Sequence, residues 1–152
     1  MATATQSSRE RLTQSTRGRS SETWLPVGHY DPEFMIGVSV ELDRLSLLQN
    51  NWDSYGAPPI DPGIIAAARK FVEALPENFA YRPRVVPMSP GNLQFEWHHQ
   101  GKVLELEFET PKLIHFLQWY PQAGVEEEET FPASDIERAV DLIQWFMSGT
   151  TV

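Results

Sequence analysis

The sequence contains no cysteine, and this absence excludes disulfide bonds, thiolate metal sites and cysteine nucleophiles. It also has no run of about 20 apolar residues, the length that a membrane-spanning helix needs. Residues 1 to 23 lack the apolar middle region of a signal peptide. From these absences we expect a cytoplasmic protein that does not interact with a membrane.

The short motifs that carry enzymatic chemistry are missing as well. The chain has no GxGxxG or GxxxxGK[ST] nucleotide loop, no HExxH zinc motif and no GxSxG nucleophile elbow. No serine lies on a recognisable strained elbow, so nucleophilic catalysis has no candidate residue. The sequence therefore predicts no catalytic residue and no bound cofactor.

Basic residues are scarce outside the N-terminal segment. The chain carries 12 Lys and Arg against 21 Asp and Glu, a net charge of −9. Residues 1 to 21 hold four arginines and one glutamate, which leaves a net charge of −12 for positions 22 to 152. Such an acidic surface repels phosphate backbones, so we expect no direct nucleic-acid binding by the folded part. A partner protein with a basic surface matches it better, and solubility alone is the other explanation.

The first 23 residues are dominated by Ser, Thr, Gln and Arg, with Met1 and Leu12 as their larger apolar side chains. This composition cannot offset the entropy of ordering a chain. We predict a disordered tail over residues 1 to 23 and one domain over residues 24 to 152, a length that supports a single hydrophobic core.

Three segments have the residue spacing of amphipathic helices. A stripe of apolar residues predicts the first helix over about 36 to 49. Asp61 as N-cap and Pro62 at the first helical position begin the second helix, and a capping box of Ser134 and Glu137 opens the third. The apolar faces predicted for the three helices are Phe34, Val38, Leu45 and Leu48; Ile64, Ile65, Ala68, Phe71, Val72 and Leu75; and Ile136, Ala139, Val140, Ile143, Phe146 and Met147.

Between the second and third helices the apolar period changes to two, which is typical of half-buried strands. A two-residue turn at Gln100 and Gly101 sets the register of the clearest hairpin. The order ααββ(β)ββα predicts an α+β domain in which helices pack on one face of an antiparallel sheet of four or five strands. The expected strands span residues 85 to 88, 92 to 99, 102 to 109, 112 to 120 and 124 to 131.

The stretch NWDSYGAPPIDP, which starts at Asn51, contains more conformational signals than a plain turn requires. Asn50 or Asn51 can take the left-handed conformation that ends a helix, and Asp53 can close an Asx turn. Gly56 supplies permissive dihedral angles, and Tyr55 can pack its ring beneath the loop. We interpret the stretch as a structural hinge, with a partner-binding surface at Asp53 and Tyr55 as the alternative.

The NWDxYGAxP loop is followed by a helix, by an EW strand at Glu96 and Trp97 and by an ELEF strand from Glu105 to Phe108. With these features, roughly residues 47 to 109 resemble a group of small bacterial proteins of unknown function. The resemblance implies a bacterial or phage context and a recurring fold. It assigns no catalytic role to any residue.

The predicted hairpin register places carboxylates opposite one another on the face away from the aromatic core. Glu96 faces Glu105 and Gln94 faces Glu107, with His98 beside them. Facing carboxylates are unfavourable unless solvent, an arginine, a partner or a metal ion compensates them. Glu96, His98 and Glu105 are suitable ligands for Zn²⁺ or Mn²⁺. A metal-dependent hydrolase-like enzyme using these residues and Glu107 is therefore the alternative function.

Features that the core does not require indicate partner binding. Glu126, Glu127, Glu128 and Glu129 form an acidic run that is either a solvated edge or a docking strip for a basic protein. Trp145 falls opposite the apolar stripe of its helix, where it can anchor an association. We therefore expect a small acidic protein that binds another macromolecule, as an inhibitor, an antitoxin-like neutraliser or an accessory subunit.

Overall fold

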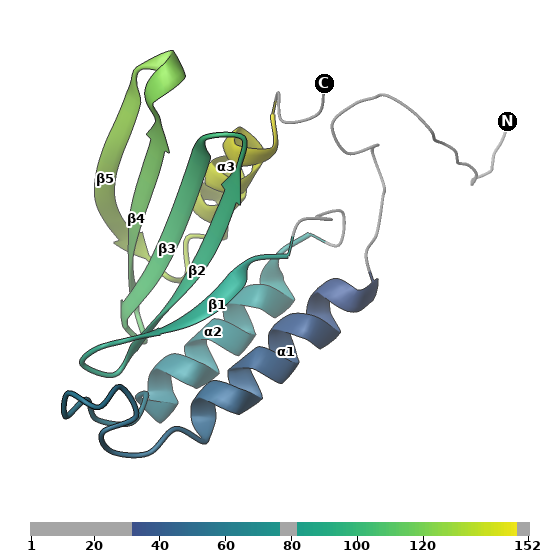
Figure 1. Ribbon diagram of the computed structural model, residues 1–152. Coiled ribbons are helices and arrows are strands. Elements are labelled where there is room, and N and C mark those ends of the chain that lie inside the picture. The colour runs from purple at the N-terminus through teal and green to yellow at the C-terminus, as the bar shows by residue number, and fades with distance from the viewer. Residues whose placement is uncertain (1–31, 77–81, 149–152) are drawn as a thin grey trace, which may run out of the picture.

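A computed structural model describes residues 32 to 76 and 82 to 148 (Figure 1). It has three α-helices and one five-stranded antiparallel sheet, which confirms the predicted α+β class. The elements are α1 (Pro32–Ser46), α2 (Pro62–Ala74), β1 (Arg84–Met88), β2 (Asn92–His99), β3 (Lys102–Thr110), β4 (Leu113–Tyr120), a 3₁₀ turn (Pro121–Ala123), β5 (Val125–Pro132) and α3 (Ile136–Met147). The tail predicted over residues 1 to 23 lies outside the described residues.

The sheet is a meander in which each strand pairs with its neighbours in the sequence, in the order β1-β2-β3-β4-β5. Gln100 and Gly101 both have positive φ, 51° and 82°, as a two-residue hairpin turn of type I′ requires. This turn produces the predicted register, with Glu96 opposite Glu105. The strands expected on the two sides of the sheet, β1 and β5, form its edges.

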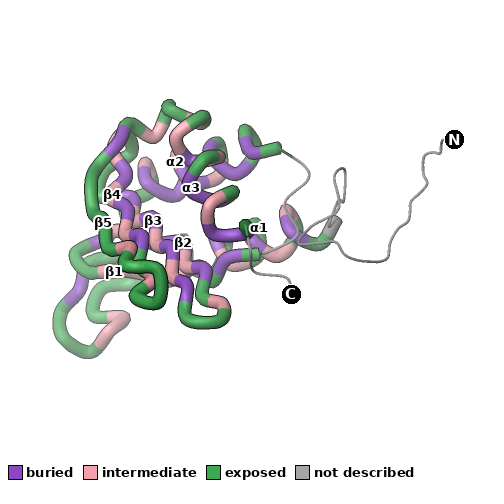
Figure 2. The backbone as a smooth tube through the Cα atoms, turned by 90° about the horizontal axis from the view of Figure 1, so that it is seen from above, coloured by how far each residue is buried: buried purple, intermediate pink, exposed green. Residues whose placement is uncertain are grey.

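The helices lie together on one side of the sheet (Figure 2), as predicted. Their apolar faces and the inward side chains of the strands form one buried cluster. At its centre Phe71 of α2 packs against two strands, with ring centroids 6.1 Å from Phe95 and 5.4 Å from Phe108. No helix of the described residues is long and apolar enough to cross a bilayer.

The second helix matches its prediction closely. The Asp61 carboxylate accepts a hydrogen bond from the Gly63 N–H at 2.8 Å, and Pro62 is the first helical residue. The predicted apolar face is buried throughout, up to Leu75 at the C-cap. Local capping chemistry and 3.6-residue periodicity agree here, so the sequence suffices to place the helix.

The other two helices correct details of the prediction. The first helix spans Pro32–Ser46 rather than 36 to 49, because Pro32 is tolerated in a first turn and the chain leaves the helix before Asn51. In the third helix the N-cap is Asp135, not Ser134, since the Asp135 carboxylate accepts from the Arg138 N–H at 3.1 Å. Leu42 and Leu142 are buried although the predicted stripes omit them, and Leu48, Ile136 and Val140 are only partly buried.

Candidate functional site

The face of the sheet that points away from the helices, here called the outer face, is a grid of side chains from all five strands. Strand pairing sets residues side by side across it. The central row consists of Arg84, Glu96, Glu105, Leu117 and Glu128. One flanking row consists of Val86, Gln94, Glu107, His115 and Thr130, and the other of His98, Val103, Trp119 and Glu126.

Glu105 lies at the centre of the outer face, and its side chain is 27% exposed. Burial raises the pKa of the Glu105 carboxyl above its ordinary value, and the charge of Glu96 raises it further. His98 opposes this shift, while Glu107 and Glu128 add to it. Ionised carboxylates are therefore crowded on this face, and the free protein bears a repulsion that a cation would relieve.

The predicted ligand triad is brought together only in part. His98 Nε2 lies 3.9 Å from Glu96 Oε1 and 3.8 Å from Glu105 Oε2. However, Glu96 already has two partners, since Arg84 Nη1 lies 3.4 Å from its Oε1 and the Gln94 side chain donates to its Oε2 at 2.7 Å. The facing carboxylates are thus compensated at Glu96 by an arginine and an amide, and metal-dependent hydrolysis at this triad stays a prediction.

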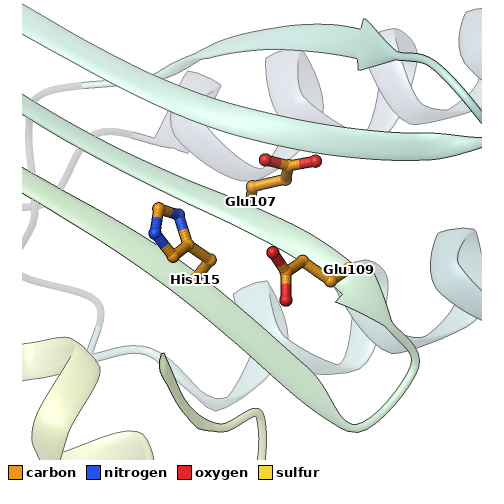
Figure 3. A group of neighbouring side chains, drawn as sticks. All are labelled: Glu107, Glu109 and His115. Carbon is orange, nitrogen blue, oxygen red and sulfur yellow. The ribbon is translucent and has the colours of Figure 1, made fainter. Parts of the chain in front are cut away.

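A second set of ligand-type side chains lies in the adjacent part of the outer face (Figure 3). Glu107 and Glu109 of β3 and His115 of β4 each offer one ligand atom, and these atoms all lie within 4.8 Å of one another. The spacing of the two glutamates already places them on one face of a strand. His115 was missed because its position opposite Glu107 depends on the β3–β4 register, which the sequence analysis did not predict.

The run from Glu126 to Glu129 forms half of edge strand β5, and all four residues are exposed. Because side chains alternate along a strand, Glu126 and Glu128 belong to the outer face. Glu127 and Glu129 point to the helix side, where Arg138 Nη2 of α3 lies 3.9 Å from Glu129 Oε1. Only half of the run therefore adds charge to the outer face, and docking of a basic protein along the whole run stays a prediction.

Trp145 of α3 is partly buried against the core rather than standing free as an anchor. The ammonium of Lys102 lies 4.7 Å from its ring centroid and donates to the carbonyl oxygens of Trp145 and Ser148 at 2.6 and 2.7 Å. Among the tryptophans of residues 32 to 76 and 82 to 148, the exposed one is instead Trp119 on the outer face, at 40% exposure. It was missed because its strand is apolar on both sides, so its sequence does not show which side is covered.

The loop after α1 has the turn geometry that its sequence predicts, while partner binding at Asp53 and Tyr55 stays a prediction. Asn51 and Gly56 have positive φ, 66° and 87°, and the Asp53 carboxylate accepts from the N–H groups of Tyr55 and Ala57 at 2.8 and 3.1 Å. These two hydrogen bonds lower the pKa of Asp53. The expected packing of the Tyr55 ring is wrong, because Tyr55 is 92% exposed. Trp52 packs against the core instead.

No protein-family model matches the chain, and no curated protein or solved structure matches it either. The resemblance of the NWDxYGAxP loop to small bacterial proteins therefore stays a prediction. Any function must be inferred from the chemistry of the molecule itself, and its most concentrated chemistry is the acidic outer face.

Proposed function

We propose that the protein binds a second protein through the outer face, and that this partner presents a basic surface. The supporting observation is that carboxylates accumulate on the side of the sheet opposite the described helices. Complementary charge across an interface steers association and fixes its register. The carboxylates of the outer face are Glu96, Glu105, Glu107, Glu109, Glu126 and Glu128.

The crowding of these groups favours a cationic partner over simple solvation. Glu105 is half-buried, and its neighbours Glu96 and Glu107 oppose its ionisation. A lysine or arginine of the partner placed among them would replace repulsion by charge-assisted hydrogen bonds. The free energy of binding would then be favoured by the new contacts and by the loss of the repulsion between carboxylates in the free protein.

The outer face also contains apolar surface that an interface requires. Trp119 is 40% exposed and its row neighbour Val103 is half-buried, while Leu117 stands between two carboxylates of the central row. Tryptophan is enriched among the residues that dominate binding energy. An inhibitor, a neutraliser or an accessory subunit would use such a surface to cover a basic site on its partner.

The test compares three forms of the full chain as baits in lysate of the native host. The outer-face variant carries Glu105→Gln and Glu128→Gln. The matched control carries Glu73→Gln and Asp141→Asn, which remove the same charge from exposed helix positions. A partner held by the parent and the control but lost by the outer-face variant is then purified for kinetic measurement.

Surface plasmon resonance over a salt series measures how the charges act. We expect the outer-face variant to associate more slowly than the parent at low salt, because exposed charges steer encounters over a Debye length of about 8 to 10 Å. The association rate of the parent should fall toward that of the variant as the salt concentration rises. Equal association rates for all three forms would overturn the assignment of the outer face as the binding surface.

A further inference from the structure

We propose that Glu107, Glu109 and His115 form a binding site for a divalent transition-metal ion, with Zn²⁺ as the best-matched ion and Mn²⁺ as the other candidate. Two carboxylates and one imidazole converge there, with their ligand atoms within 4.8 Å of one another (Figure 3). Imidazole nitrogen with carboxylate oxygen suits these ions, whereas Mg²⁺ and Ca²⁺ take oxygen ligands. This inference goes beyond the proposed function and does not rest on it.

The backbone holds two of the ligands and leaves the third adjustable. Glu107 and His115 are paired directly across β3 and β4, so strand hydrogen bonding fixes their relative position. Glu109 lies at the shift in register between Phe108 and Thr110, and it is exposed. Ligand atoms around a tetrahedral zinc ion lie about 3.4 Å apart, given Zn–N and Zn–O lengths of roughly 2.0 to 2.2 Å. Rotation of the Glu109 side chain would close the remaining gap without moving the sheet.

The surroundings of the triad orient its ligands from two further strands. Glu128 of β5 has its Oε1 3.6 Å from His115 Nε2, and one ring nitrogen of His115 is turned toward Glu107 (Figure 3). Carboxylates commonly lie behind metal-binding histidines and help to orient the ring. On the opposite side, the Asn92 side chain of β2 donates to Glu107 Oε2 at 3.0 Å. The cluster therefore has supporting partners outside the ligands themselves.

The charge balance of the outer face also favours a cation at this position. Glu96 has the guanidinium of Arg84 and the amide of Gln94 beside it, whereas Glu107 has the amide of Asn92 and shares only the imidazole of His115 with Glu109. A divalent ion would neutralise these two carboxylates and reduce the field at Glu105 nearby. We expect a bound ion to weaken the attraction of the outer face for a basic partner.

The experiment is a titration of the full chain with Zn²⁺ by isothermal calorimetry, with Mg²⁺ as the ion control. Two matched variants each remove one imidazole from the outer face. His115→Ala changes the proposed triad, and His98→Ala changes the triad of Glu96, His98 and Glu105. We expect one Zn²⁺ per chain in the parent and in His98→Ala, and a dissociation constant at least about 10-fold higher in His115→Ala. Mg²⁺ should bind more weakly than Zn²⁺.

Two further variants keep the test decisive if His115→Ala fails to fold, which circular dichroism would show. Glu109→Gln changes an exposed side chain and should also weaken Zn²⁺ binding. Glu128→Gln leaves the three ligands in place, removes the carboxylate behind the histidine and should raise the dissociation constant by about 10-fold. In addition, Zn²⁺ should shift the imidazole signals of His115 in NMR spectra more than those of His98.

Three results would overturn the proposal. Loss of Zn²⁺ binding in His98→Ala with retention in His115→Ala would place the ion among Glu96, His98 and Glu105 instead. Equal weakening in both histidine variants would indicate diffuse attraction to the acidic face. A parent protein that shows no saturable Zn²⁺ binding would exclude the site directly.

Discussion

The inner and outer faces of the sheet come from alternate residues of the same strands but have opposite surroundings. On β3, Leu104, Leu106 and Phe108 are fully buried beneath the helices, whereas Glu105 and Glu107 between them are half-buried. The same division holds on β2, where Phe95 lies in the core and Glu96 on the outer face. A single short segment thus supplies both the packing of the protein and its charge.

This difference predicts how substitutions on each face affect the stability of the protein. Inner side chains are close-packed, so removing volume there leaves a cavity. Outer side chains contact solvent on one side, and the negative charges of their carboxylates repel one another. We therefore expect substitutions on the inner face to lower stability, and some on the outer face to leave it unchanged or raise it.

The largest effect is expected for Phe95→Ala on the inner face. Phe95 is 1% exposed, and its ring centroid lies 5.8 Å from that of Phe108 and 6.3 Å from that of Trp97. Its truncation should lower the free energy of unfolding by about 3 to 5 kcal/mol. Denaturant unfolding measures this loss, and Val103→Ala on the outer face, expected to cost about 1 kcal/mol or less, is the control. Similar losses in both variants would show that the two faces do not differ in packing.

The next effect concerns the one cation that the inner face buries among the described strand residues, Lys102. Lys102→Met keeps the aliphatic stem but removes the ammonium that donates to the carbonyl oxygens of Trp145 and Ser148, and of these two only the Trp145 oxygen still accepts from the Ser148 hydroxyl, at 2.8 Å. The free energy of unfolding should fall by about 1 to 3 kcal/mol. Lys112→Met, at an exposed position, should leave thermal unfolding unchanged. If Lys102→Met is as stable as that control, the lysine does not hold the end of α3.

A smaller loss should follow truncation of the exposed tryptophan. Trp119 is 40% exposed on the outer face, whereas Trp97 is 3% exposed on the inner face. Trp119→Ala should cost about 1 to 2 kcal/mol and Trp97→Ala about 3 to 5 kcal/mol, because less buried area is lost in the first case. Chemical denaturation compares the two. Equal costs would mean that the outer face is packed against a further element.

The smallest effect has the opposite sign. Glu105→Gln should raise the free energy of unfolding at pH 7 by about 0.5 kcal/mol, because a neutral amide escapes the repulsion of the opposite carboxylate. The pKa of Glu105 is raised in the folded state, so above pH 4.5 the folded protein binds a proton at Glu105 more tightly than the unfolded chain does. The free energy of unfolding of the parent therefore falls as the pH rises through and above 4.5. The gain from glutamine should therefore fade as the pH falls below 4.5, where Glu105 is protonated in both states.

Melting temperatures of the parent and of Glu105→Gln at pH 7 and at acidic pH measure this dependence. Glu137→Gln, at an exposed position in the first turn of α3, provides a comparison for general changes in net charge. A gain in Glu105→Gln that persists unchanged at acidic pH would contradict an electrostatic cause.

Features that depend on neighbours in the chain could be predicted from the residues alone. The turn at Gln100 and Gly101 set the hairpin register, Asp61 capped α2, and Asp53 closed the turn after α1. Each of these is decided within a few residues by φ preference, alternation or a side chain that satisfies a nearby N–H. The facing carboxylates Glu96 and Glu105 followed from that same local register.

Contacts between side chains of distant segments, in contrast, depend on how the whole chain packs. The meeting of His115 with Glu107 depends on the β3–β4 register, and the cover over Trp145 depends on Lys102 reaching it from another element. Trp119 is exposed because the helices pack on the other side of its strand, although both sides of that strand are apolar. Local propensity cannot choose between two apolar sides, since that choice is made by the packing of the whole core.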